Sequence, residues 1–403
     1  MCKKQIFLAT AALISLSAPR ISAQETAGQI KWYGFIRNYA HVDSHESVSG
    51  TADLFNYLPK DNDNNTATYH LSAITSRLGV DVTGYKFNNL SATAKIEADF
   101  YNGVSGVTGT AVLRLRQAYV TLGTKNETSS STIKIGQAWH PMASDMPDVI
   151  SLNTGAPFGP FSRTPLAQYD YSSNNGLGIT AAVIWQQQYT SAGPSGASAD
   201  YQKYSPVPEI YVGVNLISDN GLVRLGVDMV NISPNKDGKL FTTISPFLYA
   251  QYKKDLFSVK FKTVYAQAGE HLNLNGGYAL ASDGEHFTPT RNSSNWVSLS
   301  YGKKWQGVLF GGYVKNYGTA EAIVADASKI YFSKNSFSNM NAMWRLTPTV
   351  IRNIGKITLA LEYEVTSVQY GDNTKFNFEN ALADKELHWV TNNRLQFMVK
   401  YAF

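Results

Sequence analysis

Arginine side chains recur at alternating positions of apolar segments, which is the spacing that places them on one face of a β-strand. The stretch 111–124 reads AVLRLRQAYVTLGT, in which Leu113 and Leu115 alternate with Arg114 and Arg116. Successive side chains of a strand point to opposite faces, so the leucines face one side and the arginines the other. A guanidinium group is always charged and presents a planar fork of donors, which suits carboxylates, phosphates and other anions.

Five arginines are expected at one level of a closed sheet. Counted along the chain from short turns or from the ends, and at about 3.3 Å per residue with about 40° of strand tilt, they lie roughly 20–30 Å above the short-turn end. The five residues are Arg37, Arg77, Arg114, Arg116 and Arg394. Because the strands that carry them are near neighbours in such a sheet, we expect one basic patch on the inner wall.

The neighbouring strand 90–102 supplies inward-facing charges to this patch. Glu97 and Asp99 share a face with Lys95 and lie beside the arginines. The carboxylates either neutralise arginines in a salt-bridge ladder that braces the wall, or leave them free to align anionic and zwitterionic solutes in a constriction. Both interpretations stay open, and each can hold for different arginines.

The segment after this hairpin, residues 142–165, is long and rich in proline. It contains the acids Asp145 and Asp148, which we expect to belong to the constriction together with Glu97 and Asp99. Its glycines, its prolines and the apolar Phe158 and Phe161 suit a compact loop held against a wall better than a solvated surface loop. We therefore expect this loop to lie inside the lumen.

Sixteen segments compatible with strands position these residues, and the connections between them alternate in length. Seven connections are short turns, including Asp219-Asn220-Gly221, and the other eight are mostly long. This alternation predicts an all-β, transmembrane, antiparallel barrel of about sixteen strands, with lipid outside and polar residues inside. The expected strands are 28–43, 69–87, 90–102, 111–124, 132–141, 166–173, 177–189, 208–218, 222–233, 240–253, 256–268, 294–304, 308–318, 340–352, 356–369 and 387–403.

The first 23 residues are expected to be a signal peptide. Lys3 and Lys4 precede the apolar run IFLATAALISLSA, and cleavage is predicted between Ala23 and Gln24, which leaves one barrel domain over 24–403. The only cysteine, Cys2, lies in this segment, so the mature chain has no disulfide. Removal of its three cationic residues lowers the formal net charge from +5 to +2, which gives nucleic-acid binding no support.

The last strand alternates strictly and ends on an aromatic residue. One face carries Arg394, Gln396, Met398 and Lys400. The other face carries Leu395, Phe397, Val399, Tyr401 and Phe403. A terminal phenylalanine after such a strand resembles the signal that the outer-membrane barrel assembly machinery reads. We expect Phe403 and Tyr401 to form that signal and lipid to cover this face; an edge strand of a soluble sandwich is the alternative.

Several segments in this order resemble the sixteen-stranded trimeric porins of Gram-negative outer membranes, and most of all the DcaP-like porins. They are KWYGFIRN in the first strand, SRLGVDVTG at 76–84, RLRQAYVTLG at 114–123, IGQAWHP at 135–141 and the terminal Phe403. The resemblance covers the whole mature chain and implies a homotrimer whose loop after the fifth strand folds into the lumen. One departure is that this loop has only two acids, which argues against a strong transverse field.

The resulting functional hypothesis is an outer-membrane porin that passes small hydrophilic solutes passively with a weak anion bias. Within the same barrel class, a channel selective for carboxylates, phosphate or sugars is the alternative. From another class, an outer-membrane enzyme or a surface adhesin on a barrel anchor is a further alternative. The sequence has no HExxH, GxSxG or phosphate-binding glycine loop, so we expect no catalytic residue and no cofactor.

Two segments have metal-ligand spacing, but neither predicts a metal site. His41, Asp43 and His45 share one strand face, which is more typical of a polar rim. Asp61, Asp63 and Asn65 begin like a calcium loop. The calcium-loop pattern is not completed, because Thr66 stands where the pattern needs glycine and Ser72 stands where it needs the closing acid.

The signal-peptide prediction is open to a direct measurement. Mass spectrometry of the protein isolated from membranes should find a mature chain that begins at Gln24, because the charged start, the apolar core and Ala23 together make a cleavage site. Recovery of peptides from residues 1–23 in that material would show that the segment is retained.

Overall fold

A computed structural model describes residues 28–49, 56–62, 66–102, 111–151, 154–186, 189–198, 200–236, 238–332 and 337–403. The predicted signal peptide with its Ala23/Gln24 cleavage site, and Asp63 and Asn65 of the calcium-loop comparison, lie outside these residues. No helix in the described ranges is long and apolar enough to span a membrane.

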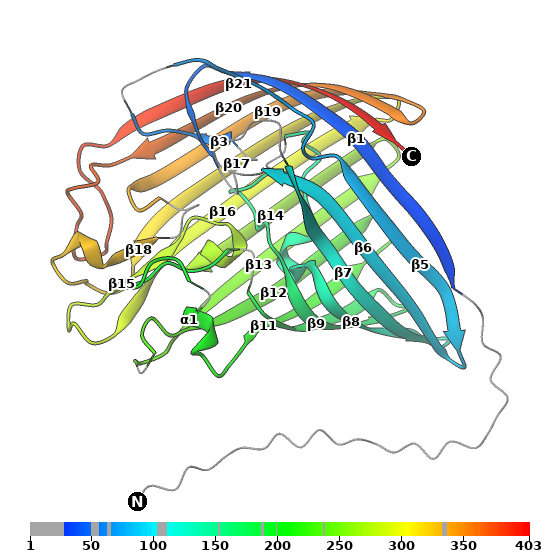
Figure 1. Ribbon diagram of the computed structural model, residues 1–403, viewed down its shortest axis with the longest axis horizontal. Coiled ribbons are helices and arrows are strands. Elements are labelled where there is room, and N and C mark those ends of the chain that lie inside the picture. Colours follow the sequence, from blue (N-terminus) through cyan, green and yellow to red (C-terminus); the bar gives the residue numbers. More distant parts are fainter. Residues whose placement is uncertain are drawn as a thin grey trace, which may run out of the picture.

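Sixteen long strands of the described chain form one antiparallel barrel (Figure 1). They are β1 (Gln29–Asp43), β5 (Arg77–Phe87), β6 (Leu90–Asn102), β7 (Ala111–Lys125), β8 (Ser129–Trp139), β9 (Arg163–Ser173), β10 (Leu177–Ile184), β11 (Glu209–Ile217), β12 (Gly221–Ile232), β13 (Phe241–Lys254), β14 (Phe257–Gln267), β16 (Phe287–Gly302), β17 (Trp305–Thr319), β19 (Met340–Ile354), β20 (Ile357–Tyr370) and β21 (His388–Ala402).

The barrel closes because β1 pairs on both of its sides. One side pairs with β21, from Phe35 opposite Ala402 to Asp43 opposite Arg394. The other side pairs with β5 and, toward the long-loop end, with the short β4 (Thr68–Ser72). Closure leaves no unpaired sheet edge, which is the condition for a sheet in lipid.

The side-chain pattern is inverted relative to a soluble sheet, as the alternation predicted. In β21, Leu395 and Phe397 are 52% and 45% exposed, whereas Arg394 and Gln396 are 3% and 2% exposed. In this part of the strand, apolar side chains therefore face outward and polar side chains face the interior. The all-β barrel and its sixteen strands are confirmed.

The three largest departures from the predicted strands are the following. The expected strand 69–87 is two strands, β4 and β5, separated by a turn in which the Ser76 N–H donates to Ala73 O. β16 begins at Phe287 instead of 294, because its first residues pair with the short β15 (Gly277–Leu280) above the barrel. β10 ends at Ile184, well before 189.

Small elements in the long connections cover the long-loop end. A hairpin of β2 (Ser47–Ser49) and β3 (Asn56–Pro59) turns inward: Leu58 is buried, and the Tyr370 hydroxyl donates to Pro59 O at 2.8 Å. β15 pairs with β18 (Ile330–Phe332). The remaining elements are α1 (Asp200–Lys203) and the 3-10 turns η2 (Pro141–Ala143), η3 (Gly269–Leu272) and η4 (Ala327–Lys329).

The terminal phenylalanine packs at the closing seam between β1 and β21. Its N–H donates to Gly34 O at 3.1 Å, and its ring lies so close to Gly34 that a Cβ there would come within 2.6 Å of the Phe403 Cζ. Glycine at position 34 therefore makes room for the last side chain of the chain.

Deletion of Phe403 is expected to lower the yield of folded barrel, because it removes both this seam contact and the proposed assembly signal. The fraction that migrates as heat-modifiable, folded protein in the outer membrane measures the effect. A Gly34→Val variant with Phe403 intact, which crowds the same seam, is expected to lower the yield as well. An unchanged yield after the deletion would count against this role of the last strand.

Candidate functional site

Three of the predicted arginines form an ion-pair ladder with the two wall carboxylates. Arg114 donates through Nε and Nη2 to Asp99, at 2.8 and 2.9 Å. Arg116 donates to Glu97 at 2.8 Å and to Asp99 at 2.5 Å, and Arg77 Nη1 lies 3.5 Å from Glu97. The salt-bridge ladder that the sequence left open is thus present for these three arginines.

A β-bulge places Arg116 in this ladder. Glu97 pairs with Gln117 and the next residue, Ala98, pairs with Leu115, so Arg116 is an extra residue in its strand. As a result the adjacent Arg116 and Gln117 are both buried on the inner side, and both donate to Glu97. Simple alternation predicted the inward side for Arg116 but could not predict that Gln117 would share it.

Arg37 reaches the same wall without a carboxylate. Its guanidinium carbon lies 5.0 Å from the centroid of the Phe35 ring, and that of Arg77 lies 5.1 Å from the same centroid. Arg37 Nε donates to Thr75 Oγ1 at 3.1 Å, and the described residues place no carboxylate in an ion pair with it. The Phe35 ring therefore lies at cation–π distance from two arginine side chains, Arg37 and Arg77.

The fifth predicted arginine lies apart from the other four. Arg394 makes a two-pronged contact with Asp43, at 2.7 and 3.0 Å, and is 3% exposed. It does not line the cavity described below, so the structure brings together Arg37, Arg77, Arg114 and Arg116 but not Arg394.

The connection after β8, the fifth barrel strand, crosses the interior; residues 140–151 and 154–162 are here called the inner loop. Its two acids contact the wall formed by β12 and β14. Asp145 pairs with Arg224 at 2.9 Å, and Asp148 pairs with Lys260 at 2.6 Å. Both acids thus have cationic partners outside the arginine ladder, and neither partner was predicted from the sequence.

Backbone groups fasten the inner loop to the barrel wall. Ile150 and Ser151 donate their N–H groups to the two oxygens of Glu362 at 2.9 and 3.0 Å. The Tyr39 hydroxyl donates to Ile150 O at 3.1 Å, and Lys262 Nζ donates to Met142 O at 2.8 Å. A loop whose peptide groups bond to buried side chains of β1, β14 and β20 is positioned inside the barrel.

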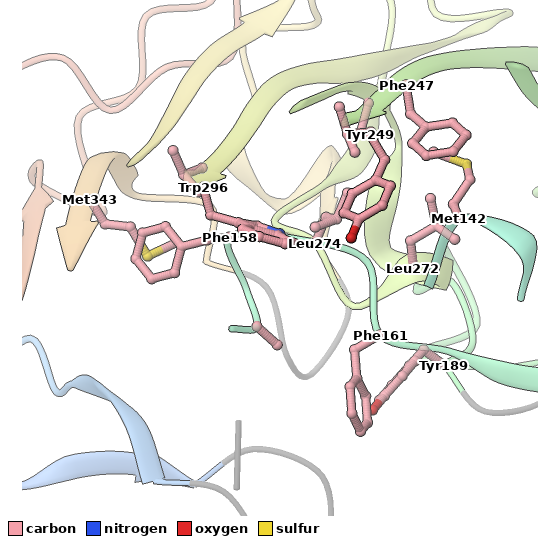
Figure 2. Close-up of a cluster of buried hydrophobic side chains, with 14 of the residues drawn as sticks. Met142, Phe158, Phe161, Tyr189, Phe247, Tyr249, Leu272, Leu274, Trp296 and Met343 are labelled. Carbon is pink, nitrogen blue, oxygen red and sulfur yellow. The ribbon is translucent and has the colours of Figure 1, made fainter. Parts of the chain in front are cut away.

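Apolar packing holds the far end of the inner loop. Phe158 is fully buried and meets Phe310 edge-on, with ring centroids 6.1 Å apart. Figure 2 shows Phe158 next to Trp296 and Met343. Gly312 permits this contact, because a Cβ there would lie 2.5 Å from the Phe158 ring.

A cavity of about 310 Å³ separates the inner loop from the arginine wall. Arg37, Arg77, Arg114 and Arg116 line its wall side with Phe35, Thr75, Asp99 and Trp139. Ser144, Met146, Thr154 and Phe161 line its loop side. Arg163, which the sequence analysis missed, stacks on Trp139 at 4.7 Å and adds a fifth positive charge nearby. The wall side of this cavity therefore carries an excess of positive charge, and its loop side is neutral.

Comparison with known proteins agrees with this architecture. Residues 8–156 match the family described as DcaP outer membrane protein. The outer membrane channel DcaP of Acinetobacter baumannii aligns with 94% of this chain and 98% of its own, with a TM-score of 0.72 and 18% identity. The chain has the fold of outer-membrane β-barrel channels and is similar to DcaP and the general porins.

Two further solved outer-membrane proteins share the fold. An anion-selective porin from Comamonas acidovorans aligns with 93% of this chain and all of its own (TM-score 0.55, 13% identity). The trimer form of OmpT from Vibrio cholerae aligns with 94% of this chain and all of its own (TM-score 0.55, 12% identity). No curated protein matches the sequence.

Two groups of side chains in the described part of the barrel have the composition of a metal site. One is His41, Asp43 and His70; the other is His140, Glu209 and Asp228. In the second group, His140 Nδ1 accepts the Met142 N–H at 3.1 Å, which leaves the proton on Nε2, facing Glu209 at 2.7 Å. A protonated nitrogen donates a hydrogen bond and does not bind a metal.

The neighbouring His271 joins that second group through an ion pair with Asp228. Its Nδ1 faces Ala268 O at 3.3 Å and its Nε2 faces Asp228 Oδ2 at 2.9 Å, so both nitrogens meet acceptors. Burial lowers the pKa of His271, but the negative charges of Glu209 and Asp228 outweigh burial and raise it. The group is therefore a hydrogen-bonded network that joins the inner loop to β11, β12 and η3.

Replacement of both loop acids, Asp145→Asn with Asp148→Asn, is expected to loosen the inner loop, because it breaks the ion pairs with Arg224 and Lys260. Single-channel recordings should show larger current fluctuations and a higher mean conductance. Asp219→Asn, in an exposed turn between β11 and β12, serves as the matched control. Recordings indistinguishable from wild type would mean that the two pairs do not hold the loop.

Proposed function

We propose that this porin mediates passive diffusion of small hydrophilic solutes with a weak preference for anions. The observation that supports it is the asymmetry of the cavity. Four arginines line the wall side, while the loop acids Asp145 and Asp148 pair with Arg224 and Lys260 elsewhere. An anion that crosses the cavity therefore meets positive charge without a facing row of free carboxylates.

The expected preference is weak because part of the positive charge is neutralised. Four arginines meet two wall carboxylates, Glu97 and Asp99, which leaves an excess of two positive charges. Arg37, which has a ring and a hydroxyl as partners, contributes most directly to this excess. The field is expected to fade in concentrated salt, since the Debye length falls to about 3 Å at 1 M.

Two solved relatives support parts of the proposal. The Comamonas acidovorans porin is described as anion-selective, which is the sense of bias that we propose here. OmpT of Vibrio cholerae is described in a trimer form, and we propose a homotrimer for this chain. The proposal contains no enzymatic step and needs no cofactor.

A substrate-selective channel is the second candidate, and the aromatic lining favours it. Phe35, Trp139 and Phe161 line the same cavity as the arginines. Such a lining can bind a solute that has both a charge and an apolar part. Conductance that saturates at low solute concentration would favour this candidate over simple diffusion.

The anion preference can be measured as the zero-current potential in a tenfold KCl gradient, for which complete selectivity gives about 59 mV. The zero-current potential of wild-type channels is expected to lie between zero and the value for complete anion selectivity. Arg37→Gln with Arg77→Gln should move the potential toward the cation side, because it removes half of the arginines that line the cavity.

Arg352→Gln is the matched control, since Arg352 packs over the outward-facing Trp305 ring at 4.9 Å. A potential that stays unchanged in the double variant, together with a lower melting temperature, would assign those arginines a bracing role only. Selectivity would then have another origin.

A further inference from the structure

Two histidines and an aspartate meet on the inner wall where β4, β1 and β21 lie side by side. His41 of β1 pairs directly with His70 of β4, and their rings stack with centroids 4.8 Å apart. Asp43 lies two residues further along β1 and so points to the same side, with Oδ2 3.7 Å from His41 Nε2. One ligand atom from each residue lies within 4.8 Å of the others.

Two buried polar atoms without hydrogen-bond partners lie in or next to this cluster. His41 is 9% exposed, and its Nε2 has no hydrogen-bond partner. On the other side of β1, Gln396 of β21 pairs directly with His41, is 2% exposed, and has an Nε2 without a partner. Buried polar atoms without partners are rare in native structures, and here two of them belong to residues in register.

Asp43 retains one acceptor position that faces the histidines. Its Oδ1 accepts from Arg394 Nε and from Asn392 Nδ2, both at 2.7 Å, and its Oδ2 accepts from Arg394 Nη2 at 3.0 Å. A carboxylate has about four such positions, so one on Oδ2 remains, and Oδ2 is the oxygen near His41.

The positive charge of Arg394 opposes a metal ion at this place, but that charge is compensated on its other side. Glu364 pairs directly with Arg394 across β20 and β21 and is 3% exposed. Glu364 also forms an ion pair with Arg345 at 3.4 Å, so two carboxylates, Asp43 and Glu364, balance two arginines, Arg394 and Arg345, and the surroundings are not cationic overall.

We propose that His41, His70 and Asp43 bind one divalent transition-metal ion of the Zn²⁺, Ni²⁺ or Cu²⁺ class. Two imidazoles and one carboxylate are a ligand set that these ions prefer, whereas Ca²⁺ and Mg²⁺ prefer oxygen ligands alone. The fourth position is left for water or for the Gln396 amide oxygen.

The structure also changes the ligand set that strand parity suggested. His45 lies in the bend beyond the end of β1 at Asp43, and its Nε2 is hydrogen-bonded to Lys60 O at 3.0 Å. His70 takes its place because it belongs to the adjacent strand and lies opposite His41. Sequence spacing along β1 alone could not identify this cross-strand ligand.

Metal binding to the refolded full-length mature barrel tests the proposal without reference to ion selectivity. Titration calorimetry with ZnCl₂ is expected to give one ion per chain. His41→Gln and His70→Gln should each weaken this binding at least tenfold, and His45→Gln, the matched control, should leave it unchanged. Heat-modifiable mobility verifies that each variant is folded. Equal binding in all four proteins, or none in the wild type, would overturn the proposal.

A second measurement needs no variant. Electron paramagnetic resonance of the wild-type barrel loaded with one equivalent of Cu²⁺ should show hyperfine coupling to two imidazole nitrogens. Coupling to fewer than two would overturn the assignment of His41 and His70, even if an ion binds. Neither experiment depends on whether the channel prefers anions.

Discussion

Lipid offers no partner to a peptide N–H or C=O group, and each unsatisfied group in hydrocarbon costs several kcal/mol. The barrel meets this constraint by closing β1 against β21 on one side and against β4 and β5 on the other. Closure in turn fixes which face of every strand meets lipid. The leucines of β7 thus lie outside and its arginines inside, which is the arrangement from which the candidate site is built.

The same constraint makes the register strict. A slip of one residue would turn Arg114 toward lipid, where an arginine at the bilayer midplane costs about 2–4 kcal/mol. On the inside, loss of one partner of a buried ion pair typically costs about 3–5 kcal/mol. Arg114 and Arg116 are held by Asp99 and Glu97 in this way, so they brace the wall. Arg37, which rests on a ring and a hydroxyl, is the member of the patch whose charge is least compensated.

The fold could be predicted from local signals, whereas the partners of the site residues could not. Alternation and turns such as Asn220-Gly221 identify strands, because parity and turn geometry are properties of a few neighbouring residues. The bulge at Arg116, the turn at 73–76 and the cross-strand pair of His41 with His70 depend on register between strands. Likewise, the prediction that Asp145 and Asp148 belong to the constriction rested on their segment and could not foresee Arg224 and Lys260, which are far along the chain.

The anchoring of the inner loop connects architecture with ion preference. A loop inside a lumen must satisfy its own peptide groups, and here Glu362, Tyr39 and Lys262 do so from the wall. Its carboxylates contribute to the same anchoring, because each is paired with a cation of β12 or β14. A carboxylate that is paired with an opposite charge contributes little field to the passage beside it. The more tightly the acids hold the loop, the less they can oppose the arginines, so the rigidity of the loop and the anion bias proposed above would have a common cause.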